Sequence, residues 1–170
     1  MRILPILAAA GLTAAPAAAA ELKLTLEIPR LEVAEYHRPY LAIWVERPDQ
    51  QAAATLAVWY DMGQRNAEGE KWLKDIRQWW RRAGREMRMP VDGVSGATRA
   101  PGRHGLTFDA AKGPLSDLPP GSYTLVVEAA REVGGRELLR LPFQWPPAAA
   151  QSAQAQGNSE LGAVSLDLRP

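Results

Sequence analysis

The residues whose types and spacing could carry out chemistry lie in one short segment. Within seven positions it holds a carboxylate and two hydroxyls separated by small residues: Asp92, Gly93, Val94, Ser95, Gly96, Ala97 and Thr98. Small neighbours allow a phosphate group to approach a backbone and a hydroxyl closely. The guanidinium group of Arg99, the next residue, has a geometry that suits phosphate oxygens. These residue types suit phosphoryl chemistry at a hydroxyl oxygen.

The composition around this segment predicts a loop. Gly93 and Gly96 lie within it, and Pro101 and Gly102 follow shortly after it. A surface loop is where a second enzyme can reach a hydroxyl. The alternative is a plain glycine-rich turn, in which Asp92 caps the backbone and Thr98 enters a strand.

Residues 92–98 resemble the flavinylation signal of bacterial extracytoplasmic redox proteins. In that signal, an acidic residue and two spacers precede a Ser/Thr-Gly-Ala-Thr run. The resemblance implies that an FAD-dependent flavin transferase, using Mg²⁺, joins FMN to the Thr98 hydroxyl through a phosphoester, and AMP leaves. It further implies that Arg99 pairs with the attached phosphate. The residues that the transferase would recognise are Asp92, Ser95, Gly96 and Ala97.

A wider resemblance extends over essentially the whole chain after its leader. It rests on the run SGATRAPG at 95–102, PGSY at 120–123, EAARE at 128–132 and the glycine pair 134–135. These runs are similar to a family of predicted periplasmic proteins, the domain of unknown function 2271. The resemblance implies a periplasmic location and association with flavin transferases and with PepSY-type membrane redox proteins.

Short runs with the residue pattern of β-strands make up most of the remaining chain. Residues 22–28 alternate apolar and polar positions, which is typical of a half-buried strand. The glycines at 134–135 predict a hairpin, with Arg131 and Glu132 as an exposed pair at its end. Further strands are predicted at 40–46, 55–60, 105–108, 122–128, 137–143 and 163–168. This pattern predicts a mainly β fold, an Ig-like two-sheet β-sandwich over residues 21–170, with a flexible Ala/Gln/Pro-rich loop at 146–158.

One amphipathic helix is predicted between Glu70 and Ala83, directly before the motif. Its apolar residues share one face at helical spacing: Trp72, Leu73, Ile76, Trp79, Trp80 and Ala83. Large aromatic residues favour packing, so the tryptophans are expected to cover the core. The alternative is that Trp72, Trp79 or Trp80 stacks on a flavin ring. The basic run at 77–82 has a second interpretation, as a membrane-surface patch rather than a solvated face.

The leader and the composition restrict the classes of function. Residues 1–20 have a basic start, an apolar core and small residues before Glu21, which predicts a signal peptide for the general export route. The absence of cysteine excludes disulfides, iron–sulfur ligation and c-type haem attachment. A net charge of +1 gives no case for nucleic acid binding, and two histidines argue against a metal site. We expect no membrane-embedded segment after the leader.

Three functions remain open at this point. The first is a periplasmic electron carrier with FMN on Thr98, in which the flavin and no side chain performs the redox chemistry. The second is a non-enzymatic binding or scaffold module that uses the face or edge of the sandwich. The third is a flavin-dependent reductase with a substrate of its own. His104, six residues after Thr98, would contact a flavin or lie at the surface at the start of a strand.

Overall fold

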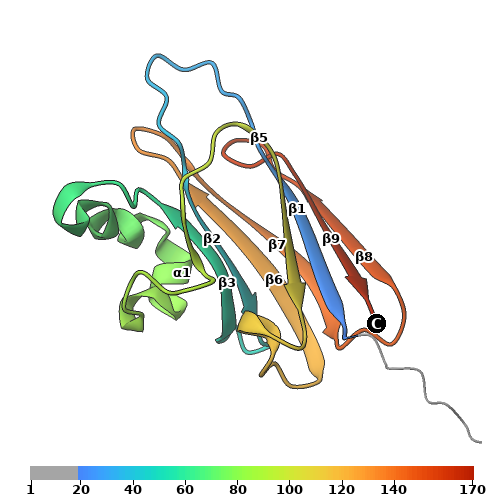
Figure 1. The fold of residues 1–170 in the computed structure, drawn as a ribbon. Helices are drawn as coiled ribbons and strands as arrows, with labels where there is room; N and C mark the ends of the chain where they lie inside the picture. The colour runs from blue at the N-terminus through green and yellow to red at the C-terminus, as the bar shows by residue number, and fades with distance from the viewer. Residues whose placement is uncertain (1–18) are drawn as a thin grey trace, which may run out of the picture.

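The fold is a sandwich of two β-sheets with a helical layer outside one of them (Figure 1). The computed structural model describes residues 19–170, so the predicted signal peptide lies, up to residue 18, outside the described residues. The prediction of a mainly β two-sheet sandwich is confirmed for this part of the chain. Its strands are β1 (Glu21–Ile28), β2 (Tyr40–Glu46), β3 (Ala52–Tyr60), β4 (Ser95–Ala97), β5 (Gly102–Asp109), β6 (Gly121–Ala130), β7 (Arg136–Trp145), β8 (Gln151–Gln156) and β9 (Ala163–Arg169).

One sheet has the strand order β5-β1-β9-β8, and its neighbouring strands are antiparallel. In its centre, Leu24 of β1 lies opposite Leu106 of β5 and Leu166 of β9. The alternation that predicted β1 holds in the structure, because its apolar positions are buried and the positions between them are partly or fully exposed.

The other sheet has the order β4-β3-β2-β6-β7 and is covered on both faces. One face of β2 contributes Leu41 and Ile43 to the core between the sheets. The opposite face contributes Ala42 and Trp44 to a second core under the helical layer. Burial on both sides explains why the sequence of β2 is almost continuously apolar rather than alternating.

The helical layer differs from the single helix predicted between Glu70 and Ala83. It consists of a 3₁₀ helix η1 (Arg65–Asp75), a short α-helix α1 (Arg77–Arg82) and a 3₁₀ turn η2 (Gly84–Glu86). A further 3₁₀ turn, η3 (Gly113–Leu115), follows β5. No helix within residues 19–170 has the length and apolar composition needed to cross a bilayer.

The break in this layer changes which tryptophan is buried. Ile76, between η1 and α1, has φ −77° and ψ 73°, which is not a helical conformation. As a result, Trp79 is buried in the second core, whereas Trp72 is 51% exposed. The buried Glu128 carboxylate of β6 accepts hydrogen bonds from the backbone N–H groups of Gln78 (3.0 Å) and Trp79 (2.9 Å). This carboxylate fixes the start of α1 to the sheet, because those N–H groups have no partner inside the helix.

Two edge strands were not predicted from the sequence. β8 lies inside the segment 146–158, so the prediction of a loop is wrong for Gln151–Gln156. Its serine and glutamines at 152, 154 and 156 are exposed, and Ala153 and Ala155 pack against the core. The partner strand β9 supplies its hydrogen bonds, which compensates for residues with low β-propensity. The second unpredicted strand is β4, in the middle of the motif.

The pH dependence of stability can be predicted at Glu137 of β7. Its carboxylate accepts hydrogen bonds from the backbone N–H groups of residues 158, 159 and 161, in the connection between β8 and β9. Partial burial favours a higher pKa for Glu137, but these hydrogen bonds to the charged form outweigh burial and lower the pKa below its ordinary value of 4.5. The carboxylate therefore stabilises the fold above about pH 4.5, and that stability is lost as the pH falls through the lowered pKa.

We expect Glu137→Gln to lower the free energy of unfolding by about 1–2 kcal/mol at neutral pH, since hydrogen bonds to a charged acceptor are lost. Urea unfolding at neutral and at acidic pH measures the effect. The difference from the wild type should shrink in acid, where the native carboxyl is protonated. Glu32→Gln, in the exposed connection between β1 and β2, is the matched control. A difference that stays constant with pH would contradict this assignment.

Candidate functional site

Residues 92–98 lie at the edge of the five-stranded sheet. The predicted loop is in part a strand, because β4 runs parallel to residues 58–60 of β3. The backbone N–H of Thr98 continues this pairing and donates a hydrogen bond of 3.2 Å to the carbonyl oxygen of Tyr60. The chain then crosses to β5, the edge strand of the other sheet. Thr98 therefore lies where the chain passes from one sheet to the other.

A tight turn precedes β4 and uses the Ser95 hydroxyl. The backbone N–H of Val91 donates to Ser95 Oγ at 2.8 Å, and the N–H of Ser95 donates to the Val91 carbonyl oxygen at 2.8 Å. Gly93 has a φ of +71°, a conformation that glycine adopts without strain. Asp92 is exposed in this turn. Ser95 thus shapes the segment, and Asp92 remains accessible to another protein.

Trp59 of β3 organises the residues on either side of Thr98. A Cβ atom added to Gly96 would lie 3.1 Å from Trp59 Cδ1, so glycine allows β4 to pack closely on the indole. The Arg99 guanidinium carbon lies 4.0 Å from the centre of the Trp59 ring, in a cation–π contact. His104 meets the same ring edge-to-face, with the ring centres 5.8 Å apart, and its Nε2 lies 2.8 Å from the Ala100 carbonyl oxygen. The stacked face of Arg99 leaves the N–H groups at the edge of its guanidinium for an acceptor.

We expect Gly96→Ala to destabilise the protein by about 1 kcal/mol, because the added methyl group requires Trp59 to move against Arg99 and His104. Chemical denaturation monitored by tryptophan fluorescence measures this loss. Gly105→Ala is the matched control, since a Cβ atom at Gly105 would meet no atom within 4 Å. Equal stabilities of the two variants would show that Trp59 does not constrain Gly96.

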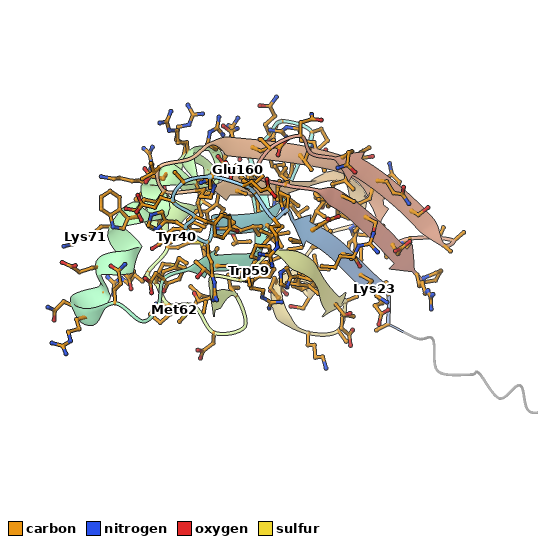
Figure 2. The ribbon with its side chains drawn as sticks, turned by 90° about the horizontal axis from the view of Figure 1, so that it is seen from above. Lys23, Tyr40, Trp59, Met62, Lys71 and Glu160 are labelled. Atoms are coloured by element: carbon orange, nitrogen blue, oxygen red, sulfur yellow. The ribbon has the colours of Figure 1, made fainter. Side chains whose placement is uncertain are left out.

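Thr98 also lines a cavity of about 790 Å³. Three other parts of the chain form its walls: the connection between β1 and β2 with the first residue of β2, the segment from Asp61 through η1 to the start of α1, and the turn between β6 and β7. In Figure 2, Tyr40 lies on the inner side of the helical layer and Lys71 on its outer side. Tyr40 belongs to the cavity wall, and its hydroxyl donates to the Gly69 carbonyl oxygen of η1 at 3.0 Å. The volume lies in the range typical of small-molecule sites, about 300–1,000 Å³.

The cavity walls combine aromatic and charged side chains. Tyr36, Tyr40 and Trp72 supply aromatic surface. Burial is the main cause that raises the pKa of Tyr36 and of Tyr40 above the ordinary value of 10.0, so both phenols are neutral near pH 7. The charged residues of the wall are Arg38, Arg77, Arg131, Arg136, Asp61, Asp75 and Glu132. Such a wall suits a ligand that has both an aromatic ring and an anionic group.

A buried ion pair supports the turn between β6 and β7. The side chains of Arg131 and Glu160 are 6% and 4% exposed, and Arg131 Nε donates to Glu160 Oε2 at 2.8 Å. The N–H of Gly135 donates to the same carboxylate, at 2.8 Å from Oε1. The sequence had predicted an exposed pair of Arg131 with Glu132. That prediction is wrong, because the loop that carries Glu160 covers the hairpin and provides a buried partner.

The structure separates the predicted site residues into two places. Thr98 lies at the cavity, together with Trp72. Asp92 and Ser95 belong to the turn, and Arg99 stacks on Trp59. Trp79 and Trp80 pack in the second core, as the sequence predicted for the tryptophans, but Trp72 does not.

Three residues at this site were missed in the sequence: Tyr36, Trp59 and Arg131. Trp59 occurs in an apolar strand, where an aromatic residue is ordinary and gives no separate signal. Tyr36 and Arg131 are brought to the cavity by folding, from segments almost a hundred residues apart. The one sequence signal for Arg131 was the glycine pair at 134–135. It predicts a tight turn, and the backbone N–H groups of such a turn need a hydrogen-bond acceptor.

Comparison with known proteins gives one match. A family model described as "Predicted periplasmic protein (DUF2271)" matches residues 21–163. The match begins directly after the predicted signal peptide and includes every wall of the cavity. No curated protein and no solved structure matches the chain.

Proposed function

The chain belongs to the DUF2271 family of predicted periplasmic proteins, and from the motif at residues 92–98 we propose that it is a periplasmic flavoprotein that carries FMN covalently on Thr98. Its role would be electron transfer with a membrane redox protein of the PepSY type as partner. One observation carries the proposal: Thr98, the acceptor expected from the motif, lines a cavity of about 790 Å³ whose walls carry aromatic and charged side chains, arginines among them.

The surroundings of Thr98 fit a phosphoester. Ala97 is exposed and small, and Gly96 has no side chain, so a second enzyme can approach the Thr98 hydroxyl along β4. The backbone N–H of Thr98 is already bonded to Tyr60, which fixes the main chain while the side-chain oxygen reacts. Arg99 follows directly and retains N–H donors for phosphate oxygens. The accessible turn around Asp92 would be the part that an FMN transferase recognises.

Covalent attachment has a physical reason in an exported protein. A chain that is exported unfolded cannot carry a bound cofactor with it, and free FMN is scarce outside the cytoplasm. Reversible binding would therefore leave the site largely empty by mass action. A covalent tether makes the local concentration of the flavin independent of the free pool.

The flavin, when attached, supplies the capacity to accept and release electrons. Thr98 is then an attachment point and not a catalytic residue. The task of the chain is to hold the cofactor: Thr98 anchors it, Arg99 neutralises phosphate charge, and the cavity walls exclude part of the solvent.

The direct test is the intact mass of the protein after co-expression with an FMN transferase in the periplasm. We expect a mass increase equal to FMN minus one water, and yellow fluorescence that stays with the denatured chain in a gel. A wild-type chain of unmodified mass, isolated with an active transferase, would contradict the proposal. Colourless protein that still binds a partner tightly would then favour a binding or scaffold module.

A further inference from the structure

Two polar groups in the cavity wall lack a protein partner. Within residues 19–170, Arg131 Nη1 and Tyr36 Oη are buried and form no hydrogen bond. Both residues line the cavity, and the Arg131 guanidinium carbon lies 5.8 Å from the centre of the Tyr36 ring. A buried donor without an acceptor destabilises the folded protein. Two such groups in one cavity wall indicate a place for a ligand with acceptor atoms.

The position of Arg131 is fixed, which makes its free donor a directional one. Its Nε and Nη2 both donate to the Glu160 carboxylate, at 2.8 and 3.1 Å. Glu160 is held in turn by the N–H of Gly135. With one edge of the guanidinium engaged in this way, Nη1 keeps both of its N–H groups for a ligand, and the ion pair holds it on a rigid support.

An exposed indole in the same cavity suits a flat ring. Trp72 is 51% exposed although it belongs to a helical segment whose other large apolar residues are buried. An exposed tryptophan at a cavity wall is typical of sites that bind aromatic ligands by stacking. Arg38 and Arg77 also line the cavity and form no ion pair within the described residues, so they offer guanidinium groups to a ligand beside the carboxylates of Asp61 and Asp75.

We propose that this cavity holds the ring of the flavin attached to Thr98, with Trp72 against the ring and with Arg131 Nη1 and Tyr36 Oη donating to its carbonyl edge. The proposal rests on FMN attachment at Thr98. The phosphate end of FMN would be fixed at Thr98, and the other walls of the same cavity offer a place for the ring. The pyrimidine edge of the ring presents carbonyl oxygens, which can accept from these two donors, and the plane of the ring can stack on an indole.

Fluorescence of the flavinylated protein tests the contact with Trp72. A neighbouring indole quenches flavin fluorescence, so we expect weak flavin emission from the folded wild type. The emission is divided by the fraction of chains that carry the flavin, which intact mass measures. Trp72→Phe should raise this emission several-fold. Trp80→Phe, a change of the same type at a tryptophan packed in the second core, should leave it unchanged.

The outcomes of this experiment are separable. Absence of the mass adduct in the wild type would overturn both the attachment and the location of the ring. A normal adduct with equal emission from all three proteins would overturn the location alone. Emission that rises only in Trp72→Phe supports the location.

A second variant tests the donor pair by thermal unfolding of protein with and without the flavin. Without flavin, Tyr36→Phe should not lower the melting temperature, because the hydroxyl has no protein acceptor. With flavin, the increase in melting temperature that attachment gives to the wild type should be smaller in Tyr36→Phe. Tyr123→Phe is the control, because Tyr123 lies outside the cavity. Its hydroxyl donates to the Pro119 carbonyl oxygen, so this change should lower the melting temperature equally with and without flavin and leave the increase that attachment gives unchanged. An equal increase in the wild type and Tyr36→Phe would overturn the donor assignment.

Discussion

Thr98→Ala abolishes the flavin adduct, whereas the variant protein still folds. This is the expected result because only the side-chain oxygen of Thr98 is lost. The backbone hydrogen bond from Thr98 to Tyr60 and the pairing of β4 with β3 remain. The hydroxyl is the sole acceptor in the proposed phosphoester, so the loss should be complete rather than partial. Intact mass and in-gel fluorescence after co-expression with a transferase measure it.

The control for this prediction is Thr107→Ala. Thr107 is an exposed threonine of β5 and should keep the full adduct when it is replaced. An adduct that persists in Thr98→Ala would place the flavin on another residue. Peptide mapping across residues 92–102 would then locate it, and the assignment of Thr98 would be wrong.

Glu160→Ala should cause the largest loss of stability among single changes around the cavity. The substitution leaves Arg131 as a buried cation without a counter-charge, and it removes the acceptor for the N–H of Gly135. Breaking a buried ion pair in this way costs about 3–5 kcal/mol. Because native proteins are stable by only about 5–15 kcal/mol, this loss is a large fraction of the total free energy of unfolding. Urea unfolding of the protein without flavin gives the difference in free energy.

Glu132→Ala is the matched control, because Glu132 lies next to Arg131 in sequence and its side chain is 72% exposed. Its contact with His37 is a surface pair, so the change should cost less than about 1 kcal/mol. Similar small losses in both variants would show that the Arg131–Glu160 pair contributes little to stability.

The strands that face the main core could be predicted from the sequence because burial on one side imposes alternation. β1 shows this pattern clearly, and it was predicted almost to its bounds. β8 escaped prediction because serine, glutamine and alanine have little β-propensity, and the neighbouring β9 supplies the order. β4 escaped because its three residues are too short and too small for any pattern.

The helical layer shows how far periodicity can mislead. The apolar spacing from Trp72 to Ala83 predicted a single helix, but the conformation of Ile76 divides it. The spacing of apolar residues shows which of them would share a face in an unbroken helix. It does not reveal a break at which the direction of the helix axis changes. The cavity was beyond prediction for a related reason. Its walls come from four separate stretches, and the partner of Arg131 lies 29 positions away in sequence.

The crossing of the chain between the two sheets has a consequence for any group attached at Thr98. Backbone pairing with β3 holds the chain up to Thr98, and β5 begins at Gly102. The backbone on either side of the attachment point can therefore move little. The rate of electron tunnelling falls steeply with the distance between donor and acceptor. A rigid attachment site would keep the distance from the attached group to the redox centre of a partner nearly constant. Electron transfer would then proceed at a similar rate in each encounter with a redox partner, in contrast to a cofactor attached to a flexible terminal segment.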